Sequence, residues 1–188
     1  MKQIFGIAGS PRINGNTHVL VSKILESAEK WDANGDIVFL NDLDIKECDG
    51  CHSCWKGNDC SKCDDMNHLY PKIIESDIII FGTPVYWYGP TALMKAFLDR
   101  FVYFNCPENR EKIRGKKAIL AVPFEEDSIE TAEPLIKMFE KSFEYLEMVL
   151  IEKIIVPGVG KKGEVLEKQE ILESCYELGK NLAIRDNF

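Results

Sequence analysis

The chain has 188 residues, 45% of them hydrophobic, which is enough to enclose one substantial core but not comfortably two. Its formal net charge of −8 and its lack of a Lys/Arg-rich block argue against nucleic acid as a partner. No run approaches the ~20 apolar residues that a membrane span needs, and the apolar opening is too short for a signal peptide. We therefore expect a single domain over residues 1–188, in the cytoplasm and with no membrane partner.

Apolar strands and amphipathic helices alternate along the chain. Strands are predicted at residues 3–9, 36–42, 77–83, 117–123 and 149–157, and several are nearly continuous Ile, Val and Phe, as in strands covered on both faces. Apolar residues recur at helical spacing within residues 20–31, 93–101, 131–146 and 166–182. We expect these residues, Trp31 and Leu166 included, to pack in the core. The alternation predicts an α/β fold, a doubly wound five-stranded parallel sheet with helices on both faces.

Ligands bind such sheets beyond the carboxyl ends of the strands. The loop after the first strand, GSPRINGNTHVL at residues 9–20, lacks the glycine patterns of dinucleotide and nucleoside triphosphate sites. It offers hydroxyl and amide groups from Ser10, Asn16 and Thr17, exposed N–H groups at a helix start, and the charge of Arg12. This combination predicts a site for a terminal phosphate. The alternative is an ordinary helix cap made by Asn16 or Thr17.

The loop after the third strand, within residues 82–100, carries three consecutive aromatic residues, Tyr86, Trp87 and Tyr88, between two prolines. They cannot all be buried on the core face of a strand. A flat ligand such as an isoalloxazine ring would explain them, with main-chain groups and Thr83 as its polar partners. The alternative is a subunit interface, where Tyr and Trp are also enriched, and both can hold at once.

Five cysteines lie in CDGCHSCWKGNDCSKC, residues 48–63, inside a loop expected at residues 43–65. In a reducing compartment, clustered cysteines more often bind metal or do redox work than form disulfides. The first four form C-x2-C-x2-C-x5-C, a compact run similar to the loop of a ferredoxin-type [4Fe–4S] site. Zinc fits less well, because four-cysteine zinc sites usually have two separate C-x2-C pairs. The fifth, Cys63, is a substitute ligand, a disulfide partner or a packing residue.

The segments GSPRINGNT, DDM at residues 64–66 and GTPVYWYGPTALMKAFLDR closely resemble the NADPH-dependent FMN reductase branch of the flavodoxin-like proteins. The cysteine spacing resembles that of the iron-sulfur flavoproteins, and the specific likeness extends over about residues 6–101. One departure is PFEEDS at residues 123–128, where the family often has a glycine-rich third flavin loop. The resemblance implies the flavodoxin-like strand order 2-1-3-4-5. The site residues it implies are Ser10, Arg12, Asn16 and Thr17 for the FMN phosphate, Pro84, Val85, Tyr86 and Trp87 for the flavin ring, and Cys48, Cys51, Cys54 and Cys60 for the cluster, and Thr83 is added as a polar partner of the ring.

The resemblance therefore implies an FMN-dependent oxidoreductase that transfers electrons between a [4Fe–4S] cluster or a ferredoxin-type donor and FMN. The alternative is an NAD(P)H-dependent FMN oxidoreductase of the quinone or nitro-compound reductase type, in which the cysteines are a vestige. A non-redox scaffold would leave the polar loop and the clustered thiols unexplained. The implied partners are ferredoxin or NAD(P)H, a small-molecule acceptor, and further copies of the chain in a homodimer or homotetramer around residues 86–104. We expect the cysteine loop and the flavin crevice to share one edge of the sheet.

Overall fold

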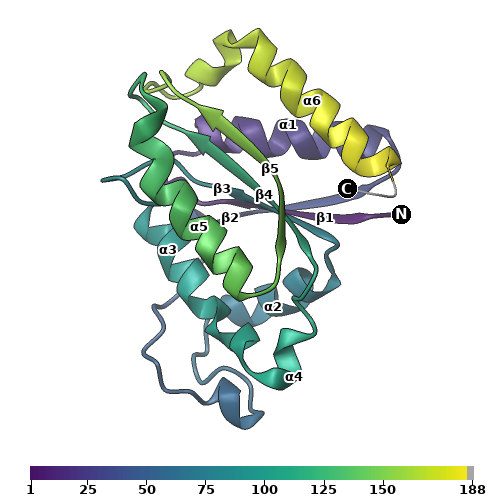
Figure 1. The fold of residues 1–188 in the computed structure, drawn as a ribbon, viewed down its shortest axis with the longest axis vertical. Coiled ribbons are helices and arrows are strands. Elements are labelled where there is room, and N and C mark those ends of the chain that lie inside the picture. The colour runs from purple at the N-terminus through teal and green to yellow at the C-terminus, as the bar shows by residue number, and fades with distance from the viewer. Residues whose placement is uncertain (186–188) are drawn as a thin grey trace.

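The computed structural model describes residues 1–185 and shows a five-stranded parallel sheet with helices on both faces (Figure 1). Every neighbouring pair of strands is parallel, and their order is β2-β1-β3-β4-β5. The strands are β1 (Gln3–Ala8), β2 (Asn34–Phe39), β3 (Ile78–Gly82), β4 (Lys117–Pro123) and β5 (Val149–Val156). The predicted doubly wound sheet and its strand order are confirmed.

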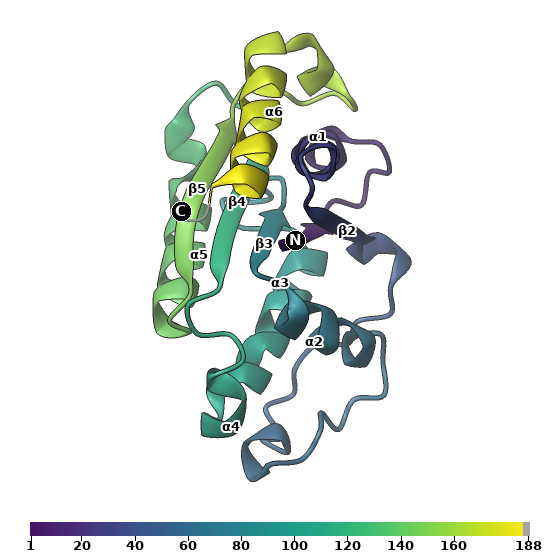
Figure 2. The same ribbon diagram turned by 90° about the vertical axis from the view of Figure 1, so that its right-hand side faces the viewer.

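Alternate side chains of the central strands enter two separate cores. Ile79 and Phe81 of β3 point to one face, and Ile78 and Ile80 point to the other. The helices are α1 (Asn16–Lys30), α2 (Met66–Glu75), α3 (Ala92–Asp99), α4 (Pro107–Arg110), α5 (Glu133–Tyr145) and α6 (Gln169–Ile184). Helices α1 and α6 pack together over one face of the sheet (Figure 2), and α2, α3 and α5 cover the other.

The structure differs from the sequence prediction where side chains are partly exposed. Strand β2 ends at Phe39, and residues 40–42 form a 3-10 turn, because this edge strand buries its side chains only in part. Trp31 and Leu166 were expected in the core, but 42% and 53% of their surfaces are exposed. Trp31 caps the C-terminus of α1, and Leu166 lies in a 3-10 turn before α6. Within residues 1–185, every helix is too short or too polar to cross a membrane.

The segment at residues 43–65 connects β2 to α2 and extends away from the sheet, at the bottom of both views (Figures 1 and 2). Its only regular element is a 3-10 turn at Cys54–Lys56. Two hydrogen bonds between Asp44 and Asp65 close the base of this cysteine loop. The Asp44 N–H donates to the Asp65 carboxylate at 2.7 Å, and the Asp65 N–H donates to the Asp44 carbonyl at 3.1 Å. The loop is therefore anchored at both ends.

Candidate functional site

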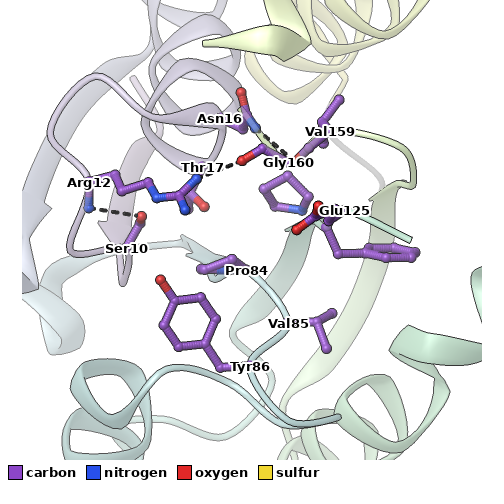
Figure 3. A pocket seen from close by; sticks show the side chains of 12 residues that line it. Ser10, Arg12, Asn16, Thr17, Pro84, Val85, Tyr86, Glu125, Val159 and Gly160 are labelled. Carbon is purple, nitrogen blue, oxygen red and sulfur yellow. Dashed lines mark hydrogen bonds between the residues drawn. The ribbon is translucent and has the colours of Figure 1, made fainter. Parts of the chain in front are cut away.

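A cleft lies at the carboxyl ends of β1, β3, β4 and β5 (Figure 3). It brings together segments that are up to 150 residues apart in the chain. The residues that line it are Ser10, Arg12, Asn16, Thr17, Pro84, Val85, Tyr86, Pro123, Phe124, Glu125, Val159 and Gly160. The cleft lies where a doubly wound sheet is expected to bind its ligand.

One end of the cleft is built by the amino terminus of α1. Gly15 precedes this helix and provides no side-chain cap, and the first turn contains no acidic residue. The first N–H groups of a helix have no partner within it, so they are available to an anion, which the helix dipole also favours. The loop before the helix is held in place because Ser10 Oγ accepts a hydrogen bond from the Arg12 N–H at 3.1 Å. Arg12 Nη1 donates to the Gly160 carbonyl at 2.7 Å, which keeps its guanidinium over the cleft.

Asn16 has a supporting place in this cleft. Its Nδ2 donates to the carbonyls of Val159 and Lys161 at 3.0 and 2.9 Å. Its Oδ1 accepts a hydrogen bond from the Val165 N–H at 3.1 Å. These bonds use both amide hydrogens, so the side chain ties the loop after β5 to the start of α1. Asn16, which is predicted to help hold a phosphate, lines the cleft with its side-chain amide already bonded to this loop.

The other end of the cleft is formed by residues 84–86. Figure 3 shows the Tyr86 ring on this side, with its hydroxyl directed toward Ser10. Tyr86 and Gly89 exchange two backbone hydrogen bonds of 2.8 and 3.0 Å, which close a two-residue hairpin. Its tip residues, Trp87 and Tyr88, have φ values of 50° and 63°. Trp87, which is predicted to line the flavin ring, is 96% exposed and lies outside the cleft lining.

Thr83 is also outside the lining, because it is fully buried beneath the loop. Its hydroxyl donates to the Pro84 carbonyl at 3.1 Å and accepts a hydrogen bond from the Thr91 N–H at 3.2 Å. Thr91 is the N-cap of α3: its Oγ1 accepts from the Met94 N–H at 3.1 Å and donates to the Gly9 carbonyl. The two threonines therefore connect both loops of the cleft through buried hydrogen bonds.

The loop after β5 was not predicted to contribute to the site, but its residues Val159 and Gly160 line the cleft. The signal was present in the sequence, since PGVG directly follows the fifth predicted strand and its carboxyl end lies at the same edge of the sheet. The PFEEDS departure also lies here, because Glu125 lies directly beside Gly160 in the lining of the cleft (Figure 3). A Cβ on Gly160 would lie 2.8 Å from Cγ of Glu125, so the glycine permits this close approach.

A second, smaller cavity of about 20 Å³ lies inside the cysteine loop. The four predicted ligands line it, namely Cys48, Cys51, Cys54 and Cys60, whereas the exposed Cys63 does not. Burial raises the pKa of the Cys54 thiol, and the neighbouring Cys60 raises it further. Among the residues that the structure describes, no three or more His, Cys, Asp or Glu side chains converge as a formed metal site. The four thiols surround a space for about one water molecule.

A profile of the NADPH-dependent FMN reductase family matches residues 2–157. The chain belongs to this family. An iron-sulfur flavoprotein of Archaeoglobus fulgidus is 40% identical over 98 residues, which is 52% of this chain and 48% of the relative. The iron-sulfur flavoprotein MJ1083 of Methanocaldococcus jannaschii is 36% identical over 98 residues, 52% and 51% of the two chains. The chain thus spans about half the length of these curated relatives.

Another relative of this FMN reductase family member matches almost end to end. YwqN of Bacillus subtilis, whose name describes an NAD(P)H-dependent FMN-containing oxidoreductase, is 27% identical over 179 residues, 93% of this chain and 94% of the relative. Among solved structures, a flavone reductase has a TM-score of 0.74 at 19% identity, with 96% of this chain and 62% of that chain covered. An archaeal flavodoxin has a TM-score of 0.59 at 14% identity, with 97% and 96% covered. These structural likenesses show a flavodoxin-like fold.

In this FMN reductase family member, Asp64 of the DDM segment anchors the cysteine loop. Asp64 forms a buried ion pair with Arg100, with Oδ2 at 2.5 Å from Nη1. Asp64 also accepts hydrogen bonds from the N–H groups of Lys46 and Met66 at 3.0 and 3.2 Å. Burial opposes its charge, but the bonds from Arg100 and these N–H groups hold the pKa of Asp64 below its usual range. Asp64 therefore clamps the two ends of the loop to the segment after α3.

The cysteine cavity does not share the edge of the sheet that forms the cleft. Its lining includes Tyr70 of α2 and Arg100, Val102 and Tyr103 after α3, and it has no residue in common with the cleft. The Trp55 Nε1–H donates to the Val102 carbonyl at 3.1 Å, which holds the loop tip against this segment. The cysteine loop and the cleft were expected at the same edge of the sheet. The loop does begin at that edge, after β2, but its cysteines lie near the C-terminal end of α3, where the bonds of Trp55 and Asp64 hold them.

Proposed function

We propose that the chain binds FMN in the cleft and acts as a flavin-dependent oxidoreductase. The observation that carries the proposal is the arrangement of the cleft, with an uncapped helix terminus and Arg12 at one end and the Pro84–Tyr86 segment at the other. FMN has a doubly charged phosphate and a flat ring at opposite ends of a ribityl chain. The two ends of the cleft suit these two groups, which supports the proposal.

Each end of the cleft has a defined task in this proposal. The first N–H groups of α1, with Ser10 and Thr17, hold the phosphate, and Arg12 neutralises part of its charge. Pro84, Val85 and Tyr86 orient the ring, while Asn16 and Thr83 fix the loops around it. Bound FMN supplies the redox chemistry, since it exchanges a hydride or single electrons. The protein therefore needs no acid–base pair of its own.

The proposed electron donor for a cluster-free reaction is NAD(P)H, and the acceptor is a small organic molecule. The family match supports a nicotinamide donor. The cleft lies at the carboxyl edge of the sheet, and we expect the nicotinamide to approach the exposed side of a ring bound there. The exposed Trp87 and Tyr88 next to this opening support a homodimer or homotetramer around residues 86–104.

The finer proposal is an iron-sulfur flavoprotein in which Cys48, Cys51, Cys54 and Cys60 hold a [4Fe–4S] cluster. The donor set fits, because four free thiols line one cavity and thiolates are the ligands of such clusters. The cavity has a volume of about 20 Å³, so the loop must widen to hold a cluster. A bound cluster would supply one-electron transfer from a ferredoxin-type donor.

A second candidate is an NAD(P)H-dependent FMN oxidoreductase without a cluster. The nearly end-to-end match to the Bacillus subtilis relative favours it. The two candidates differ in which donor reduces the flavin under anaerobic conditions. Fast bleaching by reduced ferredoxin supports the iron-sulfur flavoprotein, and fast bleaching by NADPH with no response to ferredoxin supports the second candidate.

FMN binding itself is tested by titrating the apoprotein with FMN and following the quenching of flavin fluorescence. Arg12→Gln should weaken binding about tenfold, the equivalent of a lost charged hydrogen bond of about 1.4 kcal/mol. Arg114→Gln is the matched control, because Arg114 forms its ion pairs with Glu111 and Glu147, outside the cleft. Equal affinities of the two variants, or no quenching of FMN by the wild type, would reject the cleft as the FMN site.

A further inference from the structure

We propose that Arg100 is a positioning residue that sets the reduction potential of the cysteine site by donating a hydrogen bond to Cys60. This inference rests on the proposed iron-sulfur site. Arg100 Nη2 lies 3.1 Å from Cys60 Sγ, one of the four proposed ligands. Arg100 lines the cysteine cavity but not the flavin cleft, and it acts on the site through a ligand sulfur rather than as a ligand.

The guanidinium is held in one orientation by oxygen acceptors on its Nη1 and Nη2 hydrogens. Nη1 donates to the Lys46 carbonyl at 2.9 Å and to Asp64 Oδ2 at 2.5 Å, and Nη2 donates to Asp64 Oδ1 at 3.2 Å. This two-point contact fixes the plane of the guanidinium. The remaining Nη2 hydrogen then has a set direction, and it points at the Cys60 sulfur.

The burial of the site strengthens the effect of the Arg100–Cys60 hydrogen bond on the sulfur. The side chains of Arg100 and Asp64 are 1% and 0% exposed, so water does not screen the interaction. The Tyr70 hydroxyl donates to the Arg100 carbonyl at 3.2 Å, and the Tyr70 ring stacks on Tyr103 at 4.1 Å between ring centroids. These contacts hold the backbone of Arg100 beside the cavity, next to the Cys60 sulfur.

The charges around Cys60 determine the direction in which each substitution should shift the reduction potential. Reduction of an iron–sulfur site adds negative charge to its sulfurs, and a hydrogen bond donated to a ligand sulfur favours the reduced form. Asp64 forms an ion pair with the same guanidinium and offsets part of its positive charge. Loss of the N–H donor should therefore lower the reduction potential. Loss of the Asp64 charge should raise it, because more of the guanidinium charge then acts on Cys60.

The test compares Arg100→Lys and Asp64→Asn with the wild type in anaerobically purified protein. Lysine keeps the positive charge but replaces the planar fork with one ammonium group, which cannot serve Asp64 and Cys60 in the same geometry. The midpoint potential of the cluster is measured by redox titration with detection by electron paramagnetic resonance, alongside iron and sulfide content. Arg114→Lys, on the surface and paired with Glu147, is the matched control.

We expect Arg100→Lys to shift the oxidised-to-reduced ratio about tenfold toward the oxidised form, which is about 59 mV for one electron. Asp64→Asn should shift it in the opposite direction, and Arg114→Lys should leave it unchanged. A merely structural clamp predicts loss of iron from both variants with no opposed shifts in potential, and that result would overturn the proposal. If Arg100→Lys does not fold, the direction of the Asp64→Asn shift decides, since a fall or no change contradicts the inference.

The wild-type measurement separates this inference from the proposed function. A wild type without iron and sulfide rejects the iron-sulfur site and the inference together. A wild type with a full cluster, whose potential is the same in both variants, rejects only the role of Arg100.

Discussion

Thr91 offers a direct test of how the cleft is held together. Its hydroxyl caps α3 at Met94 and donates to the Gly9 carbonyl beside the phosphate end of the cleft. Thr91→Val keeps the shape of the side chain and removes only the hydroxyl. Loss of the N-cap costs about 1 kcal/mol, and a buried carbonyl left without its partner costs about 1–3 kcal/mol. The free energy of unfolding should therefore fall by about 2–4 kcal/mol.

Thr91→Ser is the complementary variant, because it keeps the hydroxyl and removes one methyl group, at a cost of about 0.8 kcal/mol. Urea denaturation of the apoproteins measures both costs. FMN titration should also show weaker binding by Thr91→Val, about tenfold for each 1.4 kcal/mol of lost loop order, and near-normal binding by Thr91→Ser. Equal destabilisation by the two substitutions would show that the hydroxyl does not connect α3 to the Gly9 loop, and would refute the reasoning.

Three further predictions concern residues around the cleft. The double substitution Trp87→Asn, Tyr88→Gly places residues that tolerate positive φ at the hairpin tip, and should stabilise the apoprotein by about 1–2 kcal/mol in thermal denaturation; an unchanged or lower midpoint would contradict backbone strain there. Burial lowers the pKa of His18, against a smaller opposing effect of Glu26, and its Nδ1 accepts a hydrogen bond from the Asn14 N–H at 3.0 Å. The unfolded chain therefore binds a proton first as pH falls through about 6.5, so stability should decline there in the wild type but not in His18→Gln, and equal slopes in urea denaturation would oppose this. Glu125→Gln removes a negative charge that faces the cleft and should tighten FMN binding about threefold to tenfold at low salt, whereas weaker binding would mean that the carboxylate contacts the ligand favourably.

The sheet was predictable because its central strands are buried on both faces. Residues 78–82 are all buried in β3, and such strands read as continuous apolar runs in the sequence. The edge strand β2 gave a weaker pattern, since none of its residues is fully buried, and its bounds were accordingly displaced. Helical spacing alone placed Trp31 and Leu166 in the core, because periodicity does not show where a helix ends.

The residues of the cleft were predictable as far as they follow β1 and β3, where the motifs are local. The tasks of Asn16 and Thr83 were not, because their hydrogen-bond partners depend on the packing of distant segments. Asn16 bonds to backbone that lies 143 to 149 residues away in the sequence. Arg100 lies within the helical pattern predicted at residues 93–101, and only the structure shows that Asp64 and Cys60 are its buried partners.

The composition of the anaerobically purified protein tests the central claim most directly. FMN, iron and acid-labile sulfide are quantified per chain in the wild type, in Cys54→Ser and in the matched control Cys63→Ser. The account predicts one FMN with about four irons and four sulfides in the wild type, loss of iron but not FMN in Cys54→Ser, and full retention in Cys63→Ser. FMN without iron in the wild type would contradict the iron-sulfur site and leave a plain FMN reductase, and protein that binds no FMN would contradict the flavin cleft itself.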